Sequence, residues 1–397
     1  MASTNRNRSA TVIIIPERTE QASADNPNGS QPRLRKPHLL TVLLSLLALI
    51  TLFHFLAVMH GAIPTAVPIN CMGLLRTTDY GRVVHLQAQS QKIGAVQFTN
   101  QLLGGQSAVL IEVINTGTGQ TVDAYIYGCA MRKQTPTLIP LFTQRGLIEG
   151  SISISASNTL ITSELDTTIS SQTLAQLQPL QQNVYHEYRW QYGHFVPITF
   201  PGLYPVSSRG EAEALQQEAN NGQAQPWSDP LVTAEQMAKD IFKWPASSPQ
   251  DNILSNNGTI ARVQLVQESM QMRVTVTLER LIQRNKAGLW FVTGAQTNGM
   301  SKEQPAAASI ITSPTTIKGA GALPDGQTIA ALFDHTLTPL SLLNNPTLNV
   351  TNHGSYTGML FYKNSVQKQP GLLLIQSLPP IGSAEAGQLL LTRVILN

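Results

Sequence analysis

The stretch His38–Met59, HLLTVLLSLLALITLFHFLAVM, is apolar almost throughout and contains no Lys, Arg, Asp or Glu. About 20 helical residues, each rising roughly 1.5 Å, cross a hydrocarbon core about 30 Å thick. The stretch therefore predicts a transmembrane helix over residues 38–60. The alternative, a buried core helix, is disfavoured because such helices rarely stay apolar on every face.

Basic residues flank this stretch on one side only. Arg33, Arg35 and Lys36 precede it directly, whereas the first basic residue after it is Arg76. Basic residues beside a span tend to stay cytoplasmic. The pattern predicts a single-pass protein of the cell membrane with a cytoplasmic N-terminus and extracytoplasmic C-terminal domains. No A-x-A site follows the span, so an uncleaved signal-anchor is favoured over a cleaved signal.

Charge is unevenly distributed along the chain. Residues 1–37 hold six of the 26 Lys and Arg residues and three of the 23 Asp and Glu residues, which leaves twenty of each sign for the remainder. A neutral remainder lacks the basic footprint that non-specific nucleic-acid binding needs. Nucleic acid is therefore not expected as a partner.

The two cysteines, Cys71 and Cys129, both follow the apolar stretch. In an oxidising compartment they can form a disulfide between the segment after the span and the first folded unit. The alternative is that Cys129 is a small buried side chain at the end of an apolar strand. Zinc and iron–sulfur sites need more thiol or imidazole ligands in close register, so no metal and no cofactor is expected.

Two β-hairpins stand out in the first half of the folded region. The first joins Ser107–Asn115 to Gln120–Tyr127 through a Gly-containing loop, and the second joins Val184–Trp190 to Phe195–Phe200. β-rich runs around such loops are a strong hairpin signal. A short helix is predicted at Pro140–Arg145, ended by Gly146.

Capped helices and an alternating strand mark the region that follows. Ser208 and Glu211 have the S-x-x-E form of a capping box, and Thr233 and Gln236 repeat the device as T-x-x-Q. Residues 272–279 alternate apolar with polar side chains, which predicts a strand with one buried face.

Helical material precedes a hairpin twice, and each time the second strand carries Phe-Val, at Phe195-Val196 and at Phe291-Val292. This repetition predicts a tandem of two small α+β units. The layout resembles the cone-shaped α+β fold of the nuclear-transport-factor-like superfamily, in which a curved sheet wraps helices.

The last ninety residues are β-rich, with turn signals about every ten residues, as expected for a β-sandwich. Ile311–Ala320, ITSPTTIKGA, resembles the first strands of the immunoglobulin-like domain of bacterial spore-germination and cell-surface lipoproteins. In that family a Ser-Pro step precedes a short strand that ends in Gly. This chain has Leu323-Pro324 where the family usually has an aromatic-acidic pair. The resemblance implies a domain that binds or packs against partners and has no catalytic residues.

These observations predict a fold class: a single transmembrane helix, an α+β ectodomain of tandem small units, and a C-terminal all-β immunoglobulin-like sandwich. The predicted boundaries are a disordered cytoplasmic tail at 1–37, the transmembrane helix at 38–60, a juxtamembrane connector at 61–92, α+β units at 93–200 and 201–300, a linker at 301–309 and the sandwich at 310–397.

No catalytic motif is complete in this sequence. Catalysis commonly gathers titratable groups in a cleft, but charged residues are only 12% of the chain. His186 and His194 are predicted to face one another across the second hairpin without binding metal. Six aromatic residues are candidates to line a ligand cleft, with core packing as the alternative: Tyr185, Tyr188, Trp190, Trp227, Trp244 and Trp290.

The function favoured by the sequence is a membrane-anchored extracytoplasmic protein with a non-enzymatic binding or structural role at the bacterial cell envelope. The expected partner is an envelope protein or polymer. One alternative is a membrane-anchored hydrolase acting on cell-wall polymers, with a site built from distant residues. The other is a signalling receptor that uses its short cytoplasmic tail.

Overall fold

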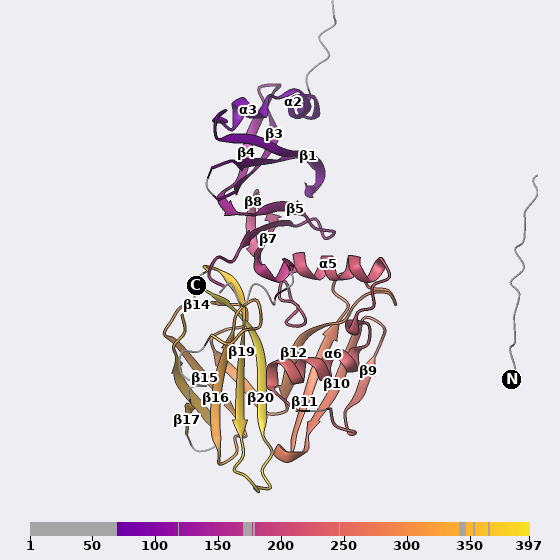
Figure 1. The fold of residues 1–397 in the computed structure, drawn as a ribbon, viewed down its shortest axis with the longest axis vertical. Coiled ribbons are helices and arrows are strands. Elements are labelled where there is room, and N and C mark those ends of the chain that lie inside the picture. The colour runs from indigo at the N-terminus through magenta and orange to yellow at the C-terminus, as the bar shows by residue number, and fades with distance from the viewer. Residues whose placement is uncertain are drawn as a thin grey trace, which may run out of the picture. The chain divides into compact units, whose positions relative to one another are not determined.

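A computed structural model describes residues 70–397 of the chain, except 118, 170–176, 178, 246, 341–346, 352–353 and 364–365. The structure is mostly antiparallel β-sheet, with 51% strand and 14% helix (Figure 1). The predicted fold class is therefore wrong: sheets dominate where α+β units were expected, and the C-terminal strands continue the sheet of the preceding region.

Within the described part of the chain, no helix is long and apolar enough to cross a bilayer. This finding conflicts with the predicted transmembrane helix and signal-anchor. The predicted span at 38–60 and the predicted tail at 1–37 lie outside the described residues.

The N-terminal sheet is a meander in the order β1-β2-β3-β4. Its strands are β1 Gln91–Leu103, β2 Gln106–Asn115, β3 Thr121–Arg132 and β4 Thr135–Ile148. The predicted first hairpin is confirmed, because β2 and β3 pair with Asn115 opposite Thr121. Two short helices, α2 (Cys71–Thr77) and α3 (Tyr80–Val83), pack their Leu75 and Tyr80 against one face of β2 and β3.

The predicted helix at Pro140–Arg145 is wrong, because these residues belong to β4. Proline lacks a backbone N–H, so within sheets it is tolerated mainly at edges. β4 is an edge strand of this sheet, and Pro136 and Pro140 therefore remove no bond to a further strand. The proline that suggested a helix start is thus compatible with the sheet.

A second four-stranded sheet has the order β5-β6-β7-β8. Its strands are β5 Ser151–Ile154, β6 Leu160–Leu165, β7 Asn183–Gln191 and β8 His194–Ile198. The predicted second hairpin is confirmed by the pairing of Trp190 with Phe195. One face of this sheet shares a core with the N-terminal sheet, in which Ile152 and Leu160 pack with Ile126.

The two predicted helices after this sheet differ in their caps. Helix α5 (Arg209–Asn220) begins after Ser208, whose hydroxyl accepts a bond from the Glu211 N–H, so the first capping box is confirmed. Helix α6 (Pro230–Met237) begins earlier than Thr233, because Asp229 is its N-cap and Pro230 its first residue. Aspartate at the N-cap followed by proline is a strong helix start.

Short turns of other helix types complete the helical material. A π-helix, Ala238–Phe242, continues α6 directly. The 3-10 turns are Pro179–Gln182, Pro226–Ser228 and Glu268–Met270.

The remaining strands form a large sheet in the order β13-β15-β18-β17-β16-β19-β20-β12-β11-β10-β9, and β14 pairs with β20 off this path. Their bounds are β9 Asn252–Asn256, β10 Ile260–Gln267, β11 Met272–Glu279, β12 Phe291–Thr297, β13 Met300–Gln304, β14 Ile310–Ile311, β15 Thr315–Gly321, β16 Gln327–Phe333, β17 Thr347–Thr351, β18 Ser355–Leu360, β19 Gln369–Leu378 and β20 Gln388–Leu396.

This sheet crosses the predicted linker at 301–309. Strand β12 pairs with β20 through Ala295 and Leu391, and β13 pairs with β15 through Met300 and Gly321. In Figure 1, β20 lies beside both β19 and β12. The strands of the last ninety residues are therefore joined to the preceding region by backbone hydrogen bonds.

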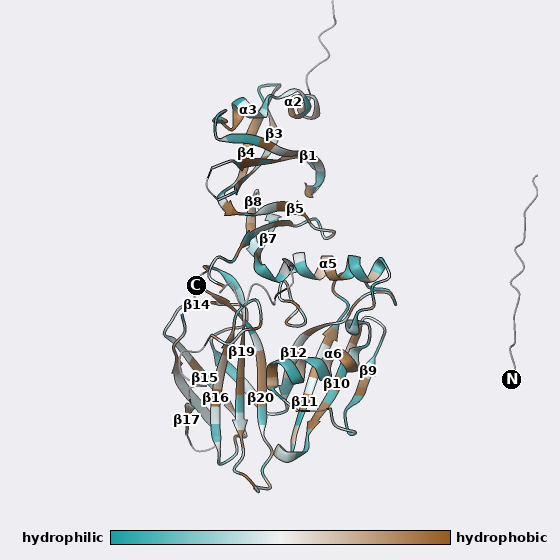
Figure 2. Ribbon diagram, in the orientation of Figure 1, coloured by the Kyte–Doolittle hydropathy of each residue, from teal (hydrophilic) through white to brown (hydrophobic). Residues whose placement is uncertain are grey.

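Strands β19 and β20 are buried on both faces. Leu372 and Leu374 pack into a core with α6 and β10–β12, whereas Leu373 and Ile375 pack into a second core with β15 and β18. Side chains alternate between faces along a strand, so a continuous apolar run fits a strand that separates two cores. Apolar stretches run along both strands in Figure 2.

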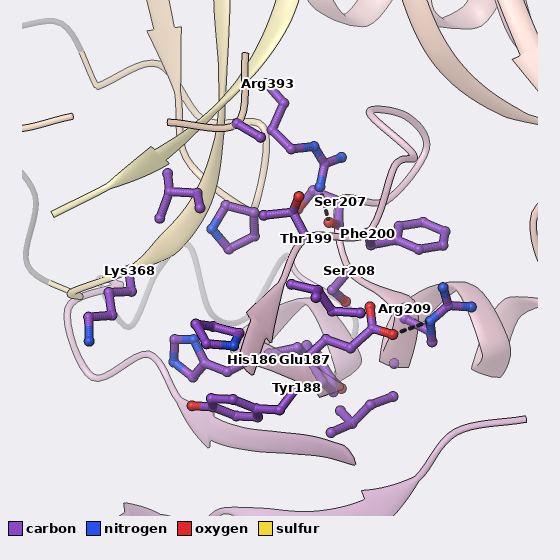
Figure 3. Close-up of a pocket in the computed structure, with 18 of the residues that line it drawn as sticks. His186, Glu187, Tyr188, Thr199, Phe200, Ser207, Ser208, Arg209, Lys368 and Arg393 are labelled. Carbon is purple, nitrogen blue, oxygen red and sulfur yellow. Dashed lines mark hydrogen bonds and ion pairs between the residues drawn. The ribbon is translucent and has the colours of Figure 1, made fainter. Parts of the chain in front are cut away.

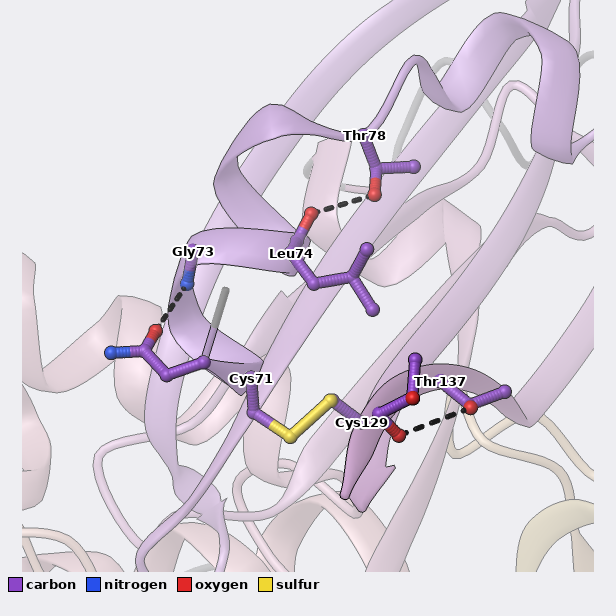
Figure 4. Close-up of a disulfide and its surroundings, with 8 residues drawn as sticks. Cys71, Gly73, Leu74, Thr78, Cys129 and Thr137 are labelled. Atoms are coloured by element: carbon purple, nitrogen blue, oxygen red, sulfur yellow. Dashed lines mark hydrogen bonds between the residues drawn. A yellow bond between two sulfur atoms is a disulfide. The ribbon is translucent and has the colours of Figure 1, made fainter. Parts of the chain in front are cut away.

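A disulfide joins Cys71, at the start of α2, to Cys129 on β3, with 5.5 Å between their Cα atoms (Figure 4). The side chain of Asn70 caps α2 by accepting a bond from the Gly73 N–H. The disulfide therefore attaches α2 to β3, an inner strand of the N-terminal sheet.

Candidate functional site

A pocket of about 630 Å³ lies where the β7–β8 hairpin, the start of α5 and the β19–β20 pair meet. Its volume is in the range of small-molecule sites, about 300–1,000 Å³. Half of the twenty residues that line it are apolar or aromatic, and they come from several elements: Ile161, Tyr185, Tyr188, Pro197, Ile198, Phe200, Ala308, Ile310, Pro370 and Ile395. Five charged residues also line it: Glu187, Arg189, Arg209, Lys368 and Arg393.

Glu187 lies on the face of the second sheet that is turned toward the pocket. Ile161 on β6 and Ile198 on β8 are its direct cross-strand neighbours, and such neighbours share a face. The carboxylate is thus set between two isoleucines and is buried. A carboxylate in such a place needs partners, because burying an unpaired charge is costly.

Two donors supply Glu187 Oε1. Arg209 Nε lies 2.5 Å from it, and the Thr159 hydroxyl donates to it at 2.6 Å. Arg209 is the first residue of α5, and its guanidinium also donates to Ser157 and lies over the Phe200 ring, 5.3 Å from the ring centroid. Glu187 Oε2 is buried and has no hydrogen-bond partner among the described residues.

Arg393 reaches the pocket from β20. It lies on the same strand face as Leu389 and Leu391, which belong to the core under α6, but it lies beyond that core. Its Nη1 donates to the Ser207 carbonyl oxygen at 3.2 Å. Figure 3 shows Arg393 and Ser207 on one side of the pocket and the Glu187–Arg209 pair on the other.

The guanidinium of Arg393 is strongly desolvated. Only 6% of the residue is exposed, and burial lowers its pKa to about 10, with the nearby Glu187 acting in the opposite direction. Arg393 therefore carries its charge at neutral pH. Within the described residues, its Nη2 and the Ser207 hydroxyl have no hydrogen-bond partner.

A polar cluster continues from the pocket into the interior through Ser208. The Ser208 hydroxyl donates to Glu211 Oε2 at 2.7 Å, and burial raises the pKa of Glu211 to about 7. Nearby, His335 Nε2 lies 3.1 Å from Asp166 Oδ2. Burial raises the pKa of Asp166, but hydrogen bonds from His335 and Thr168 outweigh it, so the net shift is downward.

A second cavity of about 600 Å³ opens beyond Glu211. Glu211, Leu215 and Glu218 line it from one face of α5, as their spacing of four and three residues dictates. Asp240 also lines it and accepts a bond of 2.6 Å from the Tyr204 hydroxyl.

The six aromatic candidates are distributed over several places. Tyr185 and Tyr188 line the first pocket, and Trp227 lines the second cavity. Trp190 packs against Phe195 with 5.0 Å between ring centroids. Trp244 and Trp290 are buried in the core under α6. The structure therefore brings only Tyr185 and Tyr188 together in one pocket.

The two histidines of the second hairpin do not face one another. His194 lies opposite Gln191 at the turn, whereas His186 lies at the other end of β7, 3.5 Å from Glu164, and lines the pocket. In the described part of the chain, no group of three His, Cys, Asp or Glu side chains is arranged to hold a metal ion.

The sequence patterns did not predict Arg393 or Ser207 as site residues. Arg393 nevertheless stands out in the sequence as a charged residue within a buried strand. Arg393 is the one charged residue of β20, QLLLTRVIL, and it stands in a largely apolar run at a position where the side chain is buried. A charge at such a position is rarely accidental, because its desolvation must be compensated.

Neither a family model, nor a curated protein, nor a solved structure matches this chain.

Proposed function

We propose that the chain is a non-enzymatic, extracytoplasmic binding protein that takes a small, largely apolar ligand in the pocket between β7–β8, α5 and β19–β20. The single observation that carries the proposal is the pocket itself. Its volume is about 630 Å³, and its surface is more apolar than polar although nine of the twenty residues that line it are polar or charged. A concave, mainly apolar surface with polar groups that can orient a ligand is typical of a small-molecule site.

The disulfide supports the extracytoplasmic part of the proposal. Both cysteines of the chain are used in the Cys71–Cys129 bond. Such bonds persist in oxidising compartments and are rare in the cytosol.

A neutral apolar fluorescent probe, N-phenyl-1-naphthylamine, tests the proposal on the full-length chain. The Ile198→Trp variant fills the pocket, since Ile198 is part of its lining. The matched control is Ile253→Trp, an exposed position on the edge strand β9. We expect one saturable site in the wild type and in the control, and at least tenfold weaker binding in Ile198→Trp. Equal binding by all three proteins would overturn the proposal.

A second candidate function is hydrolysis in the cavity around Glu211. The observation that favours it is a buried carboxyl group whose pKa is raised to about 7, in a cavity that Glu218 and Asp240 also line. Carboxyl groups tuned toward neutral pH act as general acids. A hydrolytic activity on a polysaccharide that Glu211→Gln abolishes, while binding of the fluorescent probe persists, would establish this alternative.

A further inference from the structure

We infer that the ligand of the pocket carries a carboxylate that binds Arg393 and Ser207, so that the ligand class is a small organic acid with an apolar body. This inference rests on the proposed function, because it identifies the chemistry of a ligand in the same pocket.

The buried charges of the pocket do not balance. Two guanidinium groups, those of Arg209 and Arg393, accompany one carboxylate, that of Glu187, and all three side chains are largely buried. Glu187 Oε1 is engaged by Arg209 at 2.5 Å. Arg393 forms no ion pair among the described residues: Glu187 attracts its charge only from a distance, and its hydrogen bond of 3.2 Å goes to the neutral carbonyl oxygen of Ser207.

A buried cation without an ion-pair partner destabilises the folded state, because no nearby opposite charge offsets the free energy of its desolvation. If this position served packing alone, an apolar side chain would suffice, as it does at Leu389 and Leu391 on the same face of the strand. An anion bound in the pocket would offset the desolvation free energy of Arg393. Arginine suits this role because its planar fork bonds to carboxylate oxygens in a fixed geometry.

The donors left open fit a carboxylate. Arg393 Nη2 and the Ser207 hydroxyl are both buried and without partners among the described residues. They belong to two residues that are already joined by the hydrogen bond from Arg393 Nη1 to the main-chain carbonyl oxygen of Ser207. One carboxylate has two oxygens, which can accept one bond from each donor.

The surroundings select the rest of the ligand. The net charge of the buried groups is one positive unit, which matches a monoanion better than a doubly charged phosphate. Ile198, Ile310 and Ile395 line the remainder of the pocket and favour an alkyl or aryl body through apolar burial. Arg189 and Lys368, both exposed, add positive charge at the rim and attract anions.

Displacement of N-phenyl-1-naphthylamine from the full-length chain tests the inference. The competitors are octanoate, octanol and octyltrimethylammonium at pH 7.5, which share the alkyl chain and differ in the head group. We expect octanoate to displace the probe at a concentration at least tenfold lower than octanol, because the alcohol oxygen can accept a bond from Arg393 but lacks the negative charge and the second acceptor oxygen of the carboxylate. The cation should be the weakest competitor.

The variant Arg393→Met should remove the preference, so that octanoate and octanol displace the probe at equal concentrations once each value is corrected for the affinity of the probe for the variant. Arg262→Met, at an exposed position of β10 that does not line the pocket, is the matched control and should keep the preference. If Arg393→Met failed to fold, the head-group series on the wild type would still decide.

The two proposals fail in different ways. If the probe binds, Ile198→Trp blocks it, and octanoate and octanol compete equally in the wild type, the carboxylate inference is overturned and the binding function stands. If Ile198→Trp does not weaken the probe, the pocket is not the site and both proposals fall.

Discussion

Glu187 on β7 and Arg209 at the first turn of α5 form an ion pair with 2.5 Å between Oε1 and Nε, and both side chains are largely buried. The pair links the second sheet to the helix that leads into the rest of the molecule. A buried pair is weak evidence of net stabilisation, but breaking it strands a charge in a desolvated place.

Removing both partners of this pair should therefore destabilise the protein by less than the sum of the two single losses. We expect Arg209→Met or Glu187→Met alone to lower the free energy of unfolding by about 3–5 kcal/mol, and the double variant by less than the sum of the two. Guanidinium denaturation of the four proteins gives the double-mutant cycle. Additive losses would show that the pair is not coupled.

The disulfide closes a loop of 58 residues between α2 and β3. Replacing both cysteines, Cys71→Ser with Cys129→Ser, should lower the free energy of unfolding by about 4 kcal/mol, because the unfolded chain gains conformational entropy. Guanidinium denaturation measures the loss. The wild type under reducing conditions is the matched control and should unfold at the same denaturant concentration as the variant, since the chain has no other cysteine.

Glu211 should make stability depend on pH. Its pKa is about 7 in the folded protein because of burial, whereas an exposed glutamate titrates near 4.3. The folded state therefore holds the proton more tightly than the unfolded state. The stability that this proton gives the folded protein is fully present below about pH 4.5 and is lost as the pH rises through 7. At pH 8 the free energy of unfolding is lower, by about 3–4 kcal/mol, than it would be if Glu211 stayed protonated.

The variant Glu211→Gln isolates this effect, because glutamine can still accept the bond from Ser208. We expect the variant to be more stable than the wild type at pH 8, and the difference to shrink between pH 7 and pH 5. Urea denaturation at a series of pH values measures it. A difference that stays constant with pH would mean that Glu211 does not titrate in this range.

The two faces of β19 should be equally sensitive to truncation. Leu373→Ala and Leu374→Ala each open a cavity in a different core, and each should lower the free energy of unfolding by about 2–5 kcal/mol. Ile253→Ala on the exposed edge strand is the control and should change it by less than about 0.5 kcal/mol. If only one of the two leucine variants were destabilised, β19 would not separate two cores.

Local patterns in the sequence predicted the local structure well. The two hairpins, the Ser208 cap and the alternating strand at 272–279 all depend on residues close in the chain. Prolines were less informative, because Pro140 lies on an edge strand, where proline is tolerated. The same residue type can begin a helix or occupy a sheet edge.

The assembly of the sheets and the pocket could not be predicted in this way. Strand β20 pairs with β12 across almost a hundred residues, and the pairing of two apolar strands leaves no mark in the sequence near either of them. The pocket depends on Glu187, Ser207 and Arg393, which come from three distant segments. Arg393 was recognisable as an anomaly within an apolar strand, but its partner was not.

The burial of β19 and β20 on both faces has a consequence for solvent exchange. β19 lies between β16 and β20, and β20 lies between β19 and β12. Each strand is therefore paired along both edges, and side chains cover both of its faces. Their amide protons should exchange with deuterium only when the whole domain unfolds, whereas those of the exposed edge strand β9 should exchange through local opening. The strand that carries Arg393 to the pocket should thereby stay closed until the whole domain unfolds, so the proposed ligand would meet a binding strand that is already formed.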